Sequence, residues 1–147
     1  MRAQAALRRF EGFLAEQKLR LTRQRKEILE LAWSTHDHFS ADEMADWTRK
    51  TDSHPSRATV YRTLCLLVEG GFLSSVDRGR SGVLYEHILG HSHHDHMVCL
   101  SCGKIIEFRC QEIEDLQERE AAKHHFQLER HTLLLEGTCG ACRKKRA

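Results

Sequence analysis

The chain has 147 residues and a formal net charge of +2, so its length allows one medium-sized domain or two small ones. Arg8 and Arg9 stand near the N-terminus, but no apolar run follows them as in a secretion signal, and no apolar run approaches the length of a membrane span. We therefore expect a cytoplasmic protein whose six cysteines serve as metal ligands or core residues rather than as disulfides.

The charge is distributed unevenly along the chain. Residues 1–30 carry eight Lys or Arg and four Asp or Glu, whereas residues 91–142 carry five and nine. A basic first segment is typical of a surface that meets an anion such as DNA, although charged runs also occur as plain solvated faces.

Four helices are predicted in the first half of the chain from apolar residues at helical spacing, over residues 3–17, 22–33, 40–47 and 55–71. Thr22 is the expected N-cap of the second helix, and Ser56 starts the fourth. Ser40 and Glu43 form a capping box at the third. The fourth helix ends at a glycine pair.

A hairpin is predicted next, with strands FLSSV (72–76) and VLYEHI (83–88) around the basic, glycine-containing tip DRGRSG. Helices followed by such a hairpin indicate a winged helix-turn-helix, in which the last helix enters the major groove of DNA. A plain helical domain with a surface hairpin is the alternative. The polar residues Thr59, Tyr61 and Arg62 of the fourth helix favour DNA binding, and Cys65 is expected in the core.

The second half is predicted to be a small region of helix and strand. The elements expected are a hinge at 89–92, strands at 95–100 and 104–108, a helix from Gln111 to about His125, and a longer strand at 126–137. The helix would turn Ile113 and Leu116 inward. So short a region buries little apolar surface, so we expect it to need zinc and a partner subunit.

The predicted fold is therefore α+β in two domains. A winged helix-turn-helix DNA-binding domain would span residues 1–88 and a hinge residues 89–92. A small C-terminal α/β dimerisation domain with structural zinc would span residues 93–147.

Two Cys-x-x-Cys pairs, Cys99 with Cys102 and Cys139 with Cys142, are separated by 36 residues, and each stands in a turn at the end of a predicted strand. Four thiolates in two such pairs are typical of a closed tetrahedral zinc site. Redox chemistry of the thioredoxin type could explain one pair but does not account for two.

The histidine-rich stretch from His91 to His96 also fits the H-x-H-x-D-H pattern of metallo-β-lactamase-type hydrolases. That fold needs further ligands and a much larger sandwich, whereas 51 residues follow His96. An exposed histidine run without a ligand role is another alternative, but it leaves the neighbouring carboxylates and His131 unexplained. We therefore do not expect an enzyme.

Four stretches, in order and properly spaced, carry a resemblance to a known family: HFSADEM, ATVYRTL, YEHILGHSHHDHMVCLSCGKIIEF and AAKHHFQLERHTLLLEGTCGAC. Over residues 19–142 the chain resembles the ferric uptake regulator (Fur) family of dimeric, metal-dependent bacterial transcription repressors. The resemblance implies a homodimer that binds a double-stranded DNA operator, with no membrane partner and no small-molecule substrate.

The resemblance also implies three metal sites. The structural Zn²⁺ falls on Cys99, Cys102, Cys139 and Cys142. A sensing site, which would clip the DNA-binding domain to the dimerisation domain, falls on His38, Glu86, His94, His96 and Glu107. An additional site, whose role varies among relatives, falls on His93, Asp95, Glu114 and His131. The other histidines are expected on the surface, namely His36, His54, His87, His91, His124 and His125.

The family's DNA contacts correspond to five residues of this chain. Tyr61 and Arg62 would contact bases, with Thr59 nearby on the phosphates. Arg20 matches a basic residue that enters a narrow, A·T-rich minor groove, and Arg25 matches a phosphate contact.

Three imidazoles and two carboxylates in the sensing site suit a borderline divalent ion, and iron(II) is the first expectation, with Mn²⁺ or Zn²⁺ as substitutes. The protein would then repress iron homeostasis genes. Zinc sensors of this family recruit a cysteine, so Cys110 keeps a zinc uptake regulator as an alternative. Peroxide sensors usually carry an aspartate where Glu107 stands, which makes a peroxide-stress regulator the third expectation.

Overall fold

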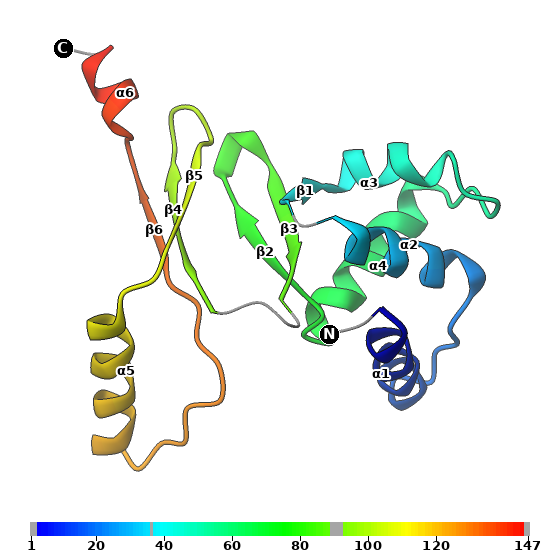
Figure 1. The fold of residues 1–147 in the computed structure, drawn as a ribbon, viewed down its shortest axis with the longest axis horizontal. Coiled ribbons are helices and arrows are strands. Elements are labelled where there is room, and N and C mark those ends of the chain that lie inside the picture. The colour runs from blue at the N-terminus through cyan, green and yellow to red at the C-terminus, as the bar shows by residue number, and fades with distance from the viewer. Residues whose placement is uncertain (1–2, 36, 89–92, 146–147) are drawn as a thin grey trace. The chain divides into compact units, whose positions relative to one another are not determined.

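The computed structural model describes residues 3–35, 37–88 and 93–145, so the predicted hinge at 89–92 lies outside the described residues (Figure 1). The chain divides into two compact units: unit 1, which is Met1–Asp77 with Gly82–Ser92, and unit 2, which is Arg78–Ser81 with His93–Ala147. Within the described residues, no helix is both long and apolar enough to cross a membrane.

Unit 1 combines helices with a three-stranded antiparallel sheet (Figure 1). Its elements are α1 (Ala3–Glu16), α2 (Arg23–Ser34), β1 (Phe39–Ser40), α3 (Ala41–Thr48), α4 (Arg57–Glu69), β2 (Leu73–Asp77) and β3 (Val83–His87). The sheet order is β1-β3-β2, and β2 pairs with β3 as the predicted hairpin. A short 3-10 turn, η1 (Gly79–Ser81), stands between these two strands. The α+β fold with an N-terminal helical region is confirmed.

Three helices of unit 1 begin at the hydroxyl caps that the sequence predicts. The side chains of Thr22 and Ser56 each accept a hydrogen bond from the backbone N–H three residues later. Ser40 and Glu43 make both hydrogen bonds of a capping box. Each cap satisfies a backbone donor that the first helical turn leaves without a partner, and loss of such a cap typically costs about 1 kcal/mol.

The core of unit 1 lies where the helices meet the sheet. Phe10 and Leu14 of α1 and Leu64 and Leu67 of α4 are fully buried, and the ring of Phe10 meets that of Phe72 edge-on at 5.3 Å between centroids. Burying a side chain of this size stabilises the fold by about 1.5–3 kcal/mol. This core fixes α4 against the rest of unit 1.

Two predictions about single residues of unit 1 are wrong. Cys65 was expected in the core but is exposed, because α4 buries the stripe that holds Leu64 and turns the next position to solvent. His87 was expected on the surface but is buried, and its ring stacks on that of Trp33 at 5.2 Å. His54, His124 and His125 are exposed as expected, whereas His36 and His91 lie outside the described residues.

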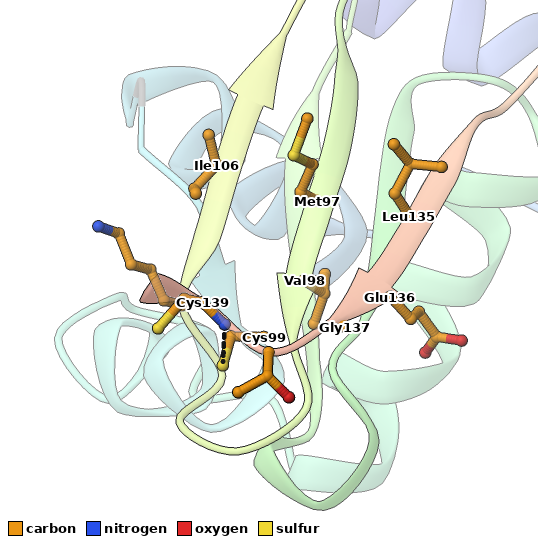
Figure 2. Close-up of a pocket in the computed structure, with 10 residues that line it drawn as sticks. Met97, Val98, Cys99, Ile106, Leu135, Glu136, Gly137 and Cys139 are labelled. Atoms are coloured by element: carbon orange, nitrogen blue, oxygen red, sulfur yellow. Dashed lines mark hydrogen bonds between the residues drawn. The ribbon is translucent and has the colours of Figure 1, made fainter. Parts of the chain in front are cut away.

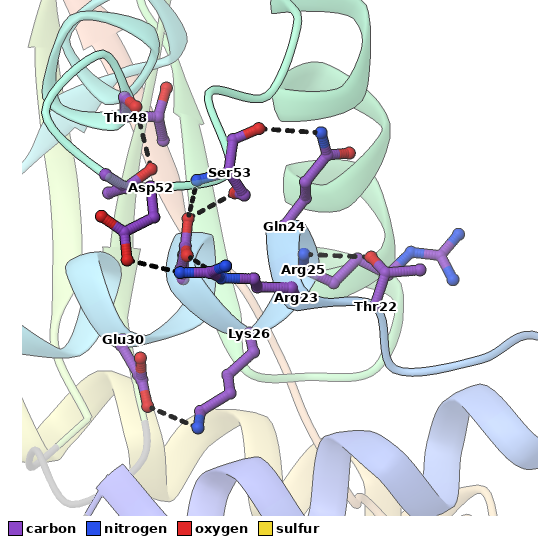
Figure 3. Close-up of polar contacts among 11 residues, drawn as sticks. Thr22, Arg23, Gln24, Arg25, Lys26, Glu30, Thr48, Asp52 and Ser53 are labelled. Carbon is purple, nitrogen blue, oxygen red and sulfur yellow. Dashed lines mark hydrogen bonds and ion pairs between the residues drawn. The ribbon is translucent and has the colours of Figure 1, made fainter.

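Polar contacts hold the loop between α3 and α4 against α2 (Figure 3). Arg23 pairs with Asp52, and Nε2 of Gln24 donates to the backbone oxygen of Ser53 at 3.3 Å. The Glu27 carboxylate accepts from the hydroxyl of Ser53, from its backbone N–H at 3.3 Å, and from Nε of Arg23 at 3.0 Å. These hydrogen bonds, above all that of the Ser53 hydroxyl, lower the pKa of Glu27 to about 2. Because this loop leads into α4, the network helps to position that helix.

The Glu27 network predicts an acid-sensitive contribution to stability. A carboxylate whose pKa is lowered on folding stabilises the fold at pH values above its unfolded pKa of 4.5, and this contribution is lost as pH falls towards about 2. Glu27→Gln should therefore show a shallower loss of stability between pH 4.5 and about 2 than the parent. Urea unfolding followed by tryptophan fluorescence measures this, since both tryptophans, Trp33 and Trp47, belong to unit 1.

The matched control is Glu30→Gln, which removes a carboxylate of the same helix that faces Lys26 at 3.8 Å. Equal pH profiles for Glu27→Gln and the parent would contradict the role of Glu27.

Unit 2 is built on a second three-stranded sheet. Its elements are β4 (Asp95–Cys99), β5 (Ile105–Phe108), α5 (Gln111–Lys123), β6 (Leu134–Gly137) and α6 (Gly140–Lys144). The order is β5-β4-β6, with β5 antiparallel and β6 parallel to β4. The central strand β4 therefore determines where residues of both neighbours lie.

Two predictions about unit 2 are wrong. The long strand expected at 126–137 is only Leu134–Gly137, because β4 is short and pairs with just four of its residues. The segment 126–133 instead returns the chain from α5 to the sheet. Ile113 and Leu116 do not face a core: none of the α5 residues, all of which the structure describes, is buried, and Leu116 is 57% exposed.

Candidate metal centres and nucleic-acid interface

The two Cys-x-x-Cys pairs meet in unit 2. Because β6 runs parallel to β4, with Gly137 beside Cys99, the turn after β4 and the segment after β6 come to the same end of the sheet. The Sγ atoms all lie within 4.8 Å of one another in the group of Cys99, Cys102, Cys139 and Cys142. The sulfurs of Cys102 and Cys139 are 3.8 Å apart. Zn–S bonds of 2.3 Å in a tetrahedron place sulfurs about 3.8 Å apart, so this donor set fits a structural zinc ion.

Hydrogen bonds shift the pKa values of these thiols. The backbone N–H of Cys139 donates to Sγ of Cys99 at 3.3 Å, which lowers the pKa of Cys99 to about 6. The pKa of Cys139 is also lowered, chiefly by the backbone of Cys142. The pKa of Cys142 is raised to about 12, first by its hydrogen bond with Cys102. Crowded sulfurs retain a proton that a bound divalent cation would displace, so zinc binding here releases protons.

A hollow beside this cluster is lined mostly by apolar side chains (Figure 2). It measures about 210 Å³, and its wall includes Met97, Ile106 and Leu135, which stand opposite one another on the three strands. These three side chains are 38%, 43% and 42% exposed. The sheet of unit 2 thus presents a row of apolar groups to its surroundings.

The histidine-rich stretch distributes its ligands by alternation. His93 meets Asp95 and His94 meets His96, which matches the alternation of side chains along the extended chain in β4 and the two residues before it. Nε2 of His93 lies 3.2 Å from Oδ1 of Asp95, and the rings of His94 and His96 are 5.0 Å apart. One short stretch therefore supplies two different clusters.

The first cluster is complete within unit 2 and contains His93, Asp95, Glu114 and His131, whose ligand atoms lie within 4.8 Å of one another. Glu114 comes from α5, and its carboxylate is 3.6 Å from Nε2 of His93 and 3.3 Å from Nε2 of His131. These are the four residues predicted for the additional site.

The chemistry of this cluster fits a divalent cation. Oδ2 of Asp95, Oε1 of Glu114 and Nε2 of His131 are buried and have no hydrogen-bond partner among the described residues. A buried polar atom without a partner costs about 1–3 kcal/mol. Two imidazoles and two carboxylates that converge in this way suit a borderline first-row metal ion.

One half of the predicted sensing set lies in unit 1. The antiparallel pairing of Phe39 with Tyr85 brings His38 beside Glu86, with 3.6 Å between Nε2 and Oε2. The hydroxyl of Ser74 donates to Oε1 of Glu86 at 2.8 Å and fixes the orientation of the carboxylate. An imidazole and a carboxylate therefore face each other where β1 pairs with β3.

The other half lies in unit 2. His96 stands opposite Glu107 in the pairing of β4 with β5, and Nε2 of His94 is 3.8 Å from Oε2 of Glu107. This half holds two imidazoles and one carboxylate. Each unit thus gathers its part of the predicted sensing set, called a half-site below, through its own strand pairing.

The residues predicted to contact DNA lie on the surface of unit 1. Tyr61 is 44% exposed and Arg62 is also exposed, both on α4, while Thr59 is half-buried near the cap of that helix. Nη1 of Arg25 on α2 donates to the backbone oxygen of Arg20 at 2.6 Å, so these two basic residues are adjacent. Arg57, which was not among the predicted DNA contacts, lies at the N-terminal end of the same face of α4 and pairs with Asp42 of α3.

A model of the ferric uptake regulator family matches residues 16–136 of the chain. The chain belongs to this family. A ferric uptake regulation protein of Campylobacter jejuni is 37% identical over 143 residues, which are 96% of this chain and 90% of that protein.

Solved Fur-family structures share the fold. The Helicobacter pylori ferric uptake regulator Fur, described as having three functional metal binding sites, aligns with a TM-score of 0.77 at 32% identity, over 97% of this chain and 95% of that one. A zinc uptake regulator complexed with zinc and DNA aligns with a TM-score of 0.57 at 29% identity, over 99% and 98%.

This Fur-family protein is therefore a metal-responsive, DNA-binding transcriptional regulator and not an enzyme. The cluster of His93, Asp95, Glu114 and His131 and the pairing of His96 with Glu107 give three residues of the H-x-H-x-D-H pattern a role as candidate metal ligands. Its four-cysteine cluster suits structural zinc, and its histidine–carboxylate clusters suit a regulatory metal.

Cys99→Ser should abolish zinc binding at the four-cysteine site of this Fur-family chain, because serine cannot supply the soft thiolate. Structural zinc contributes about 10–16 kcal/mol in small domains, so unit 2 should unfold while the core of unit 1 persists. Elemental analysis of the purified protein and amide exchange in the two units measure this. Cys110→Ser is the control, since Cys110 stands outside the cluster and donates to Glu112 at 3.2 Å. A zinc-free Cys99→Ser protein with a folded unit 2 would refute the structural role.

Proposed function

We propose that the protein is an iron(II)-responsive repressor that acts as a cytoplasmic homodimer on a double-stranded DNA operator and controls iron homeostasis genes. The observation that carries this proposal is the division of the sensing ligands. His38 and Glu86 face each other in unit 1, and His94, His96 and Glu107 gather in unit 2. Neither group alone offers the coordination that a divalent ion takes, whereas the two together offer three imidazoles and two carboxylates.

The donor types support iron(II) as the signal. The thiol of Cys110 is directed to Glu112 at 3.2 Å, which argues against its recruitment as a soft ligand in a zinc-sensing site. Glutamate rather than aspartate at position 107 argues against a peroxide sensor. A zinc uptake regulator is the second candidate, favoured by the likeness to the zinc- and DNA-bound relative.

A second copy of the chain would cover the apolar surface of unit 2. The exposed side chains of Met97, Ile106 and Leu135, and that of Leu116 on α5, are too many for a region with so small a core. Covering them with an identical surface gives a symmetric dimer. Two copies of α4 could then enter successive major grooves at one fixed spacing.

The proposed switch is a change in how often the two units adopt the DNA-binding arrangement. When metal links the half-sites, each unit 1 is held in one orientation relative to the dimer, and the affinity for the operator rises by the increase in the competent fraction. By linkage, operator DNA tightens metal binding by the same factor.

Substitution of half-site residues should separate the switch from the fold. His38→Ala, Glu86→Ala and His96→Ala should each retain the cysteine-bound zinc and the dimer but lose the stimulation of operator binding by added iron(II) or manganese. Binding is measured at fixed salt on a duplex selected from a random pool by the metal-loaded parent. His124→Ala, an exposed histidine outside the clusters, is the control. Full stimulation of His38→Ala and Glu86→Ala would transfer the sensing role to the cluster of His93, Asp95, Glu114 and His131.

Two arginines should differ in what they recognise. Arg62→Ala should weaken binding to the selected duplex by about 1–3 kcal/mol and reduce discrimination, as expected for a base contact. Arg25→Ala should weaken all duplexes alike and make the dependence of log K on log salt shallower by about one unit, as expected for a phosphate contact. Binding titrations on selected and scrambled duplexes at several salt concentrations measure both. Identical behaviour of the two variants would contradict this division.

A further inference from the structure

The first turn of α4 carries a polar group that the predicted DNA contacts do not include. Arg57 opens α4 and Tyr61 follows four residues later, so both side chains lie on one face of the helix. Both reach the same atom, Oδ1 of Asp42 in the first turn of α3. Arg57 forms an ion pair with it through Nη2, and the hydroxyl of Tyr61 donates to it at 3.5 Å.

The position of Asp42 in α3 favours a negatively charged side chain. It stands beside the capping box of Ser40 and Glu43 at the positive end of the dipole of α3, where a carboxylate is favoured. The side chains of Asp42 and Arg57 are 63% and 61% exposed. An exposed ion pair of this kind favours the paired state by about two- to fivefold at most, so a DNA phosphate can compete for Arg57.

We infer that Asp42 is a positioning residue that sets the selectivity of DNA recognition. It orients Tyr61 for base contact, and it withholds Arg57 from indiscriminate phosphate contact by pairing with the guanidinium and repelling phosphate. Affinity for random DNA arises from cations that neutralise phosphates, so Asp42 lowers that affinity more than it lowers affinity for the operator. The inference rests on the proposed role of Tyr61 at the operator.

The test compares the metal-loaded, full-length parent with Asp42→Asn, which retains the size and one acceptor oxygen of the side chain but not its charge. The probes are the duplex selected by the parent and a scrambled duplex of equal length and composition. With Arg57 released, affinity for the scrambled duplex should rise about two- to fivefold, which is the extent to which the ion pair withholds Arg57, and its log K against log salt should steepen by up to about 0.9. Affinity for the selected duplex should change less, so the ratio of the two affinities falls. Asp42→Glu, which keeps the charge, should retain the ratio of the parent.

Asp46→Asn is the matched control, because it removes the same charge from the same helix at a residue that pairs with Arg49 at 3.4 Å rather than with α4. An equal rise in scrambled-duplex affinity for Asp46→Asn would mean that general charge repulsion explains the effect, and the inference would be wrong. Asp42→Asn in an Arg57→Met background should show no such rise, since the gain acts through Arg57. Additive effects of the two substitutions would also overturn the inference.

A parent protein that binds the selected and scrambled duplexes equally would contradict the proposed function itself. A parent that discriminates between them, combined with an unchanged ratio in Asp42→Asn, would refute the inference alone.

Discussion

Four cysteine sulfurs, two from the end of β4 and the turn after it and two from the segment after β6, converge in unit 2, which has little core of its own. None of the residues of α5, all of them described, is buried, and β6 contributes only four residues in a parallel pairing, which is the less stable kind per residue. Bonds from these sulfurs to zinc can supply the folding free energy that apolar burial does not. Because Cys99 ends the central strand β4, the same bonds also fix the strand from which Asp95 and His96 project. The four-cysteine cluster thus fixes the strand from which both histidine–carboxylate clusters of unit 2 take ligands.

The alternation of side chains along β4 and the residues before it divides the ligands between two clusters. His93 and Asp95 fall on one side and meet Glu114 and His131, whereas His94 and His96 fall on the other and meet Glu107. A shift of one residue in the pairing of β4 would exchange these sets. In the proposed sensing site, these pre-assembled half-sites would leave ion binding to bring two groups together rather than five separate side chains. This reduces the side-chain entropy that binding would otherwise lose.

Local signals predicted much of unit 1, because the capping residues and the spacing of apolar residues that indicate a helix lie within a few positions of one another. Thr22, Ser40 with Glu43, and Ser56 begin their helices as predicted. The four-cysteine cluster was also predictable, since cysteine spacing is local, whereas the two histidine–carboxylate sets were expected from the family resemblance alone. The failures are non-local. The length of β6 depends on its partner strand, the exposure of Leu116 depends on what packs on α5, and the pairing of Asp42 with Arg57 joins two helices. Cys65 is different, since its position next to Leu64 already placed it off the buried stripe.

Acidic side chains pair with basic residues of unit 1. Such pairs bear on how a metal-responsive protein avoids binding DNA when no metal is bound. On α2, Arg23 faces Asp52 and Glu27, and on α4, Arg57 faces Asp42. If every such cation were available to phosphates, the sequence-independent part of the affinity would grow by about a power of ten for each one or two contacts at low salt. The protein would then remain on DNA whether or not metal was bound, and a modest change in the competent fraction could not release it. In the proposed dimer, pairing these cations within unit 1 would keep the charge-driven affinity low, so that orientation of the two α4 helices would decide binding.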